Sequence, residues 1–356
     1  MISETKSGFD ARPEEGETIS RILDASTDNG LVDLLYTRRP DAYASYRKEP
    51  GEARVFVTRK DGVITATCAE LIRNVYIGGE ESKAAYICGL KKNPESDSSG
   101  IGPGFIRAFS RADIDFYFFG VLADNPKAKD MFEKENRLFT AKAFTSVKSY
   151  ILSPRVRIKA PKHNYTFRRA EEADLPALLD FLDREGRKKD LFPVVRSLSD
   201  YRNLHIGDFC LLLDGEEILA CGALWDSTDY KQYVVKRYHP LVKAARVLNP
   251  LIAALGFVRL PKENEPLAFP MLSFLLPKDG NEDLFHIFLN EVRKEVQKQY
   301  GMYVFDLPEG HFARKRLDRL PGVSFTTRFY QIRFPWNGQT NKTVDPDRLA
   351  MESGLL

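Results

Sequence analysis

Three glycines in one short segment are the residues best suited to bind a charged ligand. Gly100, Gly102 and Gly104 follow an apolar stretch over residues 84–90 and precede apolar residues at helical spacing that begin with Phe105. Glycine lets successive backbone NH groups point toward one centre, and the unpaired NH groups at the start of a helix favour negative charge. A strand, a glycine-rich loop and a helix therefore indicate a pyrophosphate site, although a plain strand-to-helix turn also accounts for such glycines.

Two better-known nucleotide motifs do not fit this segment. A dinucleotide fold begins with a parallel unit at its first strand and places an acidic residue about 20 residues further on. Here the loop instead follows an antiparallel meander that we predict over residues 55–90. The Lys and the Ser or Thr of a P-loop are also absent.

The segment resembles the pyrophosphate loop of the GNAT superfamily of N-acyltransferases, which reads Q/R-x-x-G-x-G/A between the fourth strand and the third helix. Residues 97–102, DSSGIG, match the glycines of this loop. The resemblance continues downstream, where Asn125, Ala128 and Lys134 fall at the spacing of the family's N-x-x-A-x-x-x-Y-x-K segment after the fifth strand. Two motifs at the correct separation are more specific than one.

The resemblance implies a binding site for acetyl-CoA or another acyl-CoA. Gly89, Leu90 and Lys91 would pair like a strand with the pantetheine arm, and Asn125 would contact the arm from below. Asn125 also fits the N-cap of a helix that begins at Pro126, and the two roles are compatible. The residues implied to hold the pyrophosphate through their backbone groups are Ser98, Ser99, Gly100, Ile101, Gly102, Pro103, Gly104 and Phe105.

Acyl transfer also needs a base, because an ammonium group has no lone pair with which to attack a thioester. Glu70 is the candidate base, and a salt-bridge partner or a solvated strand residue is the alternative interpretation. The family's tyrosine that often protonates the leaving thiolate is replaced by Phe132, and Asp97 replaces the usual Arg or Gln. Tyr117 is the candidate acid, with Tyr86 as a second, and core packing is the alternative for both.

The surrounding elements predict an α/β (α+β) fold with two GNAT-like domains. Three antiparallel strands precede a helix, a buried strand over residues 114–122, a helix opened by Pro126 and a closing strand. The same order returns after a basic, proline-containing stretch, where Gly280 remains but the G-x-G is lost. We predict three parts: an acyl-CoA-binding domain over residues 1–155, a degenerate copy that does not bind CoA over 165–335, and a tail over 336–356. Each domain should hold a mixed, mostly antiparallel sheet flanked by helices.

Composition and charge limit the kinds of partner and cofactor that we expect for this protein. Hydrophobic residues make up 43% of the 356 residues and charged residues 29%, which suits folded domains. A net charge of +3 is too small to indicate a nucleic-acid partner. The four cysteines form no C-x-x-C pair and the five histidines no metal-binding spacing, so we expect free thiols and no metal site.

The start of the chain is polar and acidic, unlike a secretion signal. The longest apolar stretch, over residues 250–258, is shorter than the roughly 20 residues that span a bilayer. We therefore expect a cytoplasmic protein without a membrane partner.

These observations favour an N-acyltransferase that moves an acetyl or other acyl group from coenzyme A to the amine of a small molecule or peptide. A noncatalytic acyl-CoA-binding or interaction protein of the same fold is the alternative, and Asp97 and Phe132 favour it. A transferase that uses aminoacyl-tRNA is a third possibility, against which the near-neutral charge argues. The acceptor itself depends on loops and on the cleft between domains, which the motifs do not specify.

Overall fold

The computed structural model describes residues 8–25, 32–96, 102–109, 111–134, 137–254, 258, 261–335 and 342–356. Its strands are β1 (Val32–Thr37), β2 (Glu52–Lys60), β3 (Val63–Ile77), β4 (Glu80–Lys92), β5 (Phe116–Leu122), β6 (Thr140–Leu152), β7 (Thr166–Arg169), β8 (Phe209–Asp214), β9 (Glu217–Trp225), β10 (Gln232–Tyr238), β11 (Met271–Pro277), β12 (Tyr303–Pro308) and β13 (Val323–Arg333). Its α-helices are α1 (Gly16–Asp24), α2 (Ala42–Tyr46), α3 (Pro103–Phe109), α4 (Pro126–Glu133), α5 (Leu175–Gly186), α6 (Pro240–Ala245), α7 (Asn249–Ala254), α8 (Glu282–Gln299) and α9 (Arg314–Leu317).

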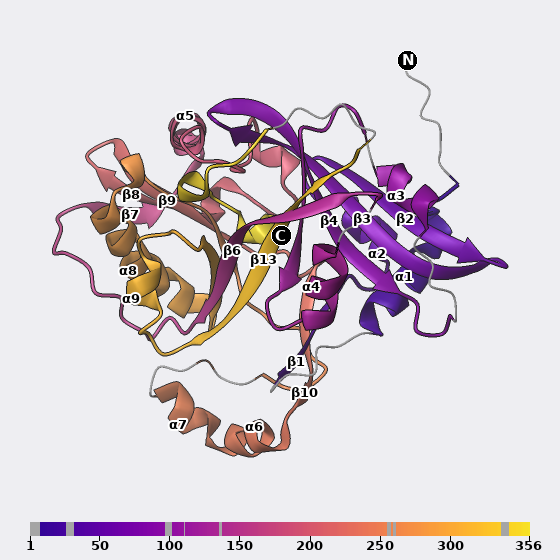
Figure 1. The fold of residues 1–356 in the computed structure, drawn as a ribbon. Helices are drawn as coiled ribbons and strands as arrows, with labels where there is room; N and C mark the ends of the chain where they lie inside the picture. Colours follow the sequence, from indigo (N-terminus) through magenta and orange to yellow (C-terminus); the bar gives the residue numbers. More distant parts are fainter. Residues whose placement is uncertain are drawn as a thin grey trace.

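One long mixed sheet runs through the described part of the molecule (Figure 1). Its eleven strands follow the order β2-β3-β4-β5-β13-β6-β12-β11-β9-β8-β7. Only the β4–β5 and β11–β12 pairs are parallel, and the other pairs are antiparallel. The predicted fold class, a mixed and mostly antiparallel sheet flanked by helices, is confirmed.

The meander at the start of the sheet forms where the turn residues predict it. Asp61 and Gly62 join β2 to β3 with φ angles of 51° and 79°, the left-handed values that a tight two-residue hairpin requires. Gly78 and Gly79 join β3 to β4 with φ angles of 64° and 83°. The sequence thus determined this part of the fold through local turn chemistry.

The alternation of side chains along β3 gives the sheet two apolar faces. Cys68 and Ile72 belong to a buried cluster with Phe105 and Phe109 of α3, whereas Ala69 packs in another cluster with residues of α1 and α2. Successive side chains of a strand point to opposite faces, so both faces can be covered. Helices α1 and α2 therefore lie on one face of the N-terminal part of the sheet, and α3 on the other.

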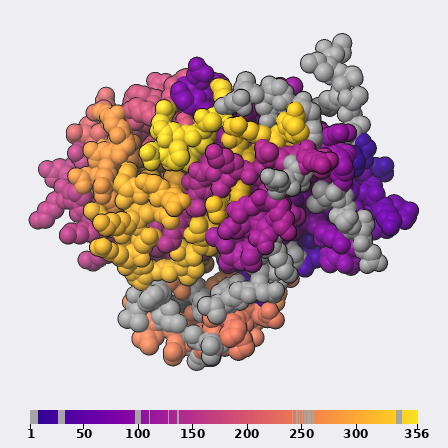
Figure 2. Space-filling view, in the orientation of Figure 1, coloured from indigo at the N-terminus to yellow at the C-terminus, as the bar shows by residue number. Residues whose placement is uncertain are grey.

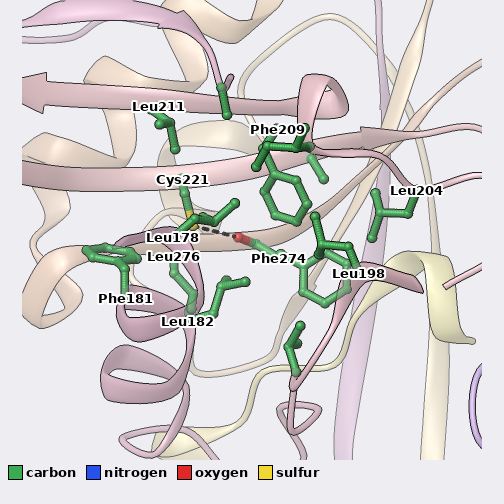
Figure 3. Packing of buried hydrophobic residues seen from close by; sticks show 14 of the residues in the cluster. Leu178, Phe181, Leu182, Leu198, Leu204, Phe209, Leu211, Cys221, Phe274 and Leu276 are labelled. Carbon is green, nitrogen blue, oxygen red and sulfur yellow. Dashed lines mark hydrogen bonds between the residues drawn. The ribbon is translucent and has the colours of Figure 1, made fainter. Parts of the chain in front are cut away.

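In the C-terminal half, α5 covers one face of the sheet in the same way. Leu178 and Leu182 of this helix are buried against Phe209 and Phe274 of the strands beneath (Figure 3). These leucines lie on a single face of the helix, because they recur at helical spacing.

The order of the strands has a feature that the sequence did not predict. β13, the last strand, lies between β5 and β6, while β6 lies between β13 and β12. Each half therefore receives one inner strand from the other half. Figure 1 shows β6 and β13 running side by side at the centre, and Figure 2 shows the C-terminal residues, coloured yellow, between the N-terminal and C-terminal halves.

A second, smaller ladder joins the two halves. β1, from the N-terminal region, pairs antiparallel with β10, which follows β9 in the C-terminal half. Helices α6 and α7 follow β10 and lie beside this ladder, away from the large sheet (Figure 1). The ladder brings Lys231, just before β10, close to Arg38, just after β1.

The cysteines are free thiols, as the sequence predicts: Cys68, Cys210 and Cys221 are buried and Cys88 is half-buried. Within the described ranges, no helix has the length and apolar character needed to cross a membrane.

Candidate acyl-donor site

The two parallel strands β4 and β5 separate in the middle of the sheet. They pair only where Ala84–Ile87 faces Phe116–Phe119, although β4 continues to Lys92 and β5 to Leu122. Beyond Ile87, the ladder of β4 in the described sheet is with β3 on its other side. The β4 residues 88–91 are half-buried even though they lie in an inner strand. Beyond Ile87, the edge of β4 that faces β5 therefore has no strand ladder in the described part of the sheet.

Gly89 lies at this separation, in a bulge of β4. The register between β3 and β4 shifts opposite Thr67 and Ala69, and Gly89 has a φ angle of 62°. A Cβ atom at this position would lie 2.2 Å from the hydroxyl oxygen of Tyr46 in α2. Only glycine satisfies both the backbone angle and this close approach. Gly89, Leu90 and Lys91, the residues implied to bind the pantetheine arm, therefore lie together at the opening.

The glycine-rich loop is described only in part. Ser98, Ser99, Gly100 and Ile101, together with Asp97, lie outside the described residues. Gly102 is half-buried, and no described atom lies within 4 Å of the place where its Cβ would be.

The residues after Gly102 begin the helix as predicted. Pro103 is the first residue of α3, and Gly104 is exposed. Phe105 is buried, and its ring packs edge-on against Phe9 and Phe109. Phe105 thus anchors the helix through its side chain.

Asn125 forms the N-cap of α4. Its side-chain oxygen accepts a hydrogen bond of 3.1 Å from the backbone NH of Ala128, and Pro126 is the first helical residue. The N-cap interpretation is therefore confirmed. Because the carboxyl ends of parallel strands meet at one edge of a sheet, Asn125 after β5 and Lys91 near the end of β4 lie at the same edge.

Glu70 lies in β3 on the face covered by α3. Its carboxylate is fully buried and pairs with Arg54 Nη1 at 3.2 Å, while its Oε1 atom has no hydrogen-bond partner in the described part of the chain. Burial raises the pKa of Glu70 to about 8, although the nearby Arg54 and Arg111 act to lower it. Glu70 is therefore mostly protonated at neutral pH and becomes a base near pH 8.

Tyr117, two strands away from Glu70 in the sheet, lies near enough for the charge of Glu70 to act on it, but its hydroxyl is already engaged. It donates a hydrogen bond of 2.9 Å to the carbonyl of Phe109 and accepts one of 2.7 Å from the backbone NH of Arg111. Burial, and then the charge of Glu70, raise the pKa of Tyr117 well above its usual range.

The second candidate acid, Tyr86, lies on the other face of the sheet, toward α1 and α2. Its ring stacks on Phe118 with 5.1 Å between ring centroids. Phe132, where the family has tyrosine, packs 4.3 Å from the ring of Phe119 on the face of α3 and α4. The structure thus brings Glu70 and Tyr117 together, and separates them from Tyr86.

A buried cluster of charges near this site was missed by the sequence reasoning. Glu49 pairs with Arg38 at 2.5 Å, with Arg73 at 3.1 Å and, more distantly, with Lys231 at 3.8 Å. These attractions hold the pKa of Glu49 at about 2 in spite of its burial. The four residues come from four separate segments with no shared spacing, so no motif could have revealed them.

This charge cluster also fixes the end of the described chain. Lys231 Nζ donates hydrogen bonds of 2.8 Å and 3.1 Å to oxygens of Gly354 and Leu356, and Arg73 donates one of 2.8 Å to Leu355. The C-terminal segment also lines a partly open cavity of about 30 Å³, together with Tyr86. A cavity of this volume has room for only about two water molecules.

Comparisons with known proteins support the fold. No model of a known protein family matches the sequence, and no curated protein matches it. Among solved structures, an N-myristoyltransferase of Saccharomyces cerevisiae with bound myristoyl-CoA is similar over 94% of this chain and 86% of that chain, with 8% identity and a TM-score of 0.55.

Two further structures are similar over most of the chain. A second structure of the S. cerevisiae enzyme with bound myristoyl-CoA has 9% identity and a TM-score of 0.54, over 94% of this chain and 82% of that one. A GCN5-related N-acetyltransferase of Anabaena variabilis has 10% identity and a TM-score of 0.49, over 92% of this chain and 72% of that one. The S. cerevisiae enzyme has only 8–9% identity to this chain, so the similarity to it shows the fold alone. The chain thus has the N-acyltransferase fold that its resemblance to the GNAT superfamily predicts, over nearly its whole length.

Proposed function

We propose that this protein is an N-acyltransferase that moves an acetyl or other acyl group from coenzyme A to the amine of a small molecule or peptide. The observation that carries the proposal is the separation of β4 from β5 after Ile87, with half-buried residues beyond it. The acyltransferase fold of the similar solved structures supports it.

The part of β4 beyond Ile87 suits the pantetheine arm, because an extended amide chain can add to a sheet edge through backbone hydrogen bonds. In this proposal Gly89, Leu90 and Lys91 supply those groups. The pyrophosphate then lies near Gly102, where open space and the start of α3 favour close approach of an anion. Asn125 caps α4 at the same edge, within reach of the arm.

Proton transfer in this proposal is assigned to the residues on the α3 face. Glu70 takes the proton of the attacking ammonium; with a pKa of about 8 only a minor fraction of Glu70 is ionised at neutral pH, so transfer should speed up as pH rises toward 8. Tyr117 can protonate the leaving thiolate only if its hydrogen bond to Phe109 breaks during turnover.

Calorimetry with acetyl-CoA and with a longer acyl-CoA tests donor binding, and release of free thiol in the presence of an amine panel tests transfer. We expect saturable heat and amine-dependent thiol release. If the folded protein gives no heat with either donor at millimolar concentration, the proposal fails.

A variant of Gly89 locates the binding site, and the chain offers a matched control. Gly89→Ala and Gly215→Ala impose the same backbone strain, because the φ angles are 62° and 60°, but only position 89 has an atom in the way of a Cβ. We expect Gly89→Ala to lose donor binding and Gly215→Ala, in a hairpin of the second half, to keep it.

A noncatalytic acyl-CoA-binding protein is the second candidate. Phe132 favours it, because this residue packs on Phe119 and offers no hydroxyl to a thiolate. Amine-dependent thiol release by the wild-type protein would exclude this candidate.

A further inference from the structure

The hydroxyl of Tyr46 is a buried polar group that lacks a role in the described part of the fold. Tyr46 is only 1% exposed, and its hydroxyl oxygen has no hydrogen-bond partner among the described residues. Buried hydroxyls in proteins are nearly always hydrogen-bonded, so an unpartnered one calls for an explanation. Here the same oxygen lies against Gly89, at the place where β4 leaves β5.

The ring of Tyr46 is held in place by rigid neighbours. The guanidinium of Arg38 lies 4.1 Å from the centre of the ring, and Arg38 is itself fixed by hydrogen bonds to Glu49 and Ser45. A cation over a phenol ring makes its O–H a stronger donor, because it withdraws electron density. Burial raises the pKa of Tyr46 well above its usual range, so the hydroxyl keeps its proton at working pH and acts as a donor.

The pairing of the strands determines which part of a bound acyl donor meets Gly89. In the proposed function, the pyrophosphate end lies at the carboxyl ends of β4 and β5, and the arm extends along β4 toward the last paired residues of the two strands, Ile87 and Phe119. The arm cannot pass this point, because the backbones are hydrogen-bonded to each other there. The reactive end of the donor therefore stops beside Cys88 and Gly89.

We propose that the hydroxyl of Tyr46 donates a hydrogen bond to the thioester carbonyl of the bound acyl donor, from the face of the sheet opposite to Phe132. This inference rests on the proposed acyl-CoA function. No proton is transferred in this contact: the hydroxyl stabilises the negative charge that develops on the carbonyl oxygen as the amine attacks, and donors placed at such a charge have a large effect on the rate.

Tyr46→Phe is the decisive variant, and Tyr43→Phe on the same helix is its control. We expect Tyr46→Phe to lower kcat about 100-fold, the usual effect of removing one such donor, while KM for the acyl donor rises only about fivefold, as expected for one hydrogen bond to the bound donor. A purely structural role would not produce this split between kcat and KM. The melting temperature should not fall, because the lost hydroxyl has no described protein partner. A kcat close to that of the wild type would overturn the proposal.

A binding measurement covers the case in which the wild-type protein binds donors without turnover. Wild type should bind acetyl-CoA more tightly than free CoA, which has no carbonyl at this position. Tyr46→Phe should weaken acetyl-CoA binding about fivefold, as expected for one hydrogen bond, and leave CoA binding unchanged. Equal weakening of both ligands, or of neither, would contradict the role of the hydroxyl. Absence of any CoA binding by the wild type would instead refute the proposed function itself.

The double variant Gly89→Ala/Tyr46→Phe tests the packing on which the inference depends. A Cβ at position 89 clashes with the Tyr46 oxygen, but the next ring atom is 3.3 Å away. We expect the double variant to melt at a higher temperature than Gly89→Ala, with a remaining loss relative to wild type no larger than that of Gly215→Ala. Its acyl-transfer rate should nevertheless remain low. If the double variant is no more stable than Gly89→Ala, the hydroxyl does not lie against Gly89.

Discussion

Replacing Glu49 with glutamine removes the only carboxylate in direct contact with the buried Arg38 and the half-buried Arg73 in the described cluster. Glutamine has nearly the same shape and can still accept hydrogen bonds, so the change isolates the charge. Arg38 remains buried and fully charged in the variant, and Lys231 loses its nearby counter-charge. We therefore expect a large loss of stability with little change in the folded structure.

The size of this loss follows from the pKa of Glu49. The neighbouring cations lower this pKa from its ordinary value of 4.5 to about 2. At about 1.4 kcal/mol for each pKa step, this shift corresponds to about 3 kcal/mol of stability at pH 7. Removing one partner from a buried ion pair typically costs a similar 3–5 kcal/mol.

The pH dependence has a definite sign. The folded pKa of Glu49 is lower than its unfolded pKa, so its stabilisation is fully present above pH 4.5 and is lost as pH falls through 2. The difference between wild type and Glu49→Gln should therefore be largest near neutral pH and shrink in acid.

Urea unfolding followed by circular dichroism measures the difference. Glu52→Gln is the control, because the Glu52 side chain is 46% exposed and its ion pair with Arg111 lies at the surface, where such pairs contribute less than about 1 kcal/mol. A loss of under about 1 kcal/mol for Glu49→Gln at pH 7, or a difference that does not vary with pH, would refute the electrostatic argument.

Three further predictions concern other parts of the fold. Glu70 has a raised pKa, so its contribution to stability is present below pH 4.5 and is lost as pH rises through 8. The Glu70→Gln variant should therefore have a higher melting temperature than wild type at pH 9 but not at pH 4. Residues 1–155 expressed alone lack β13 and should show no cooperative melting transition, whereas the full chain should melt in one step; a folded fragment would contradict the strand exchange. Asn125→Ala removes the cap of α4 and should cost about 1 kcal/mol in urea unfolding, whereas Asn125→Ser should retain most of the stability.

The sequence predicted the N-terminal sheet and its helices well, because local chemistry determines them. The hairpin at Asp61 and Gly62 needs only two residues that accept positive φ angles. The helix after Asn125 needs only a capping side chain followed by proline. Gly89 and its neighbours could be singled out through a motif, and in the structure they lie beyond the point where the pairing of β4 with β5 ends.

The sequence is a weaker guide to which strands pair with each other, because the two strands of a pair can lie far apart along the chain. β6 and β13 each read as a closing strand of its own half, and nothing in either strand shows that they pair with each other. A strand pairs through backbone hydrogen bonds and through the packing of its side chains. Many apolar strands offer nearly the same groups for both, so the sequence does not single out one partner. The assignment of domains to residues 1–155 and 165–335 therefore remains a prediction.

By itself, the sequence determined where strands and helices begin, which faces are apolar and where a backbone can turn sharply, since these depend on neighbouring residues. Only the tertiary structure decided that Tyr46 lies against Gly89, and that Arg38, Glu49 and Lys231 share one buried cluster. Such contacts join residues far apart along the chain. They arise from the packing of whole elements, and no local pattern of residue types specifies that packing.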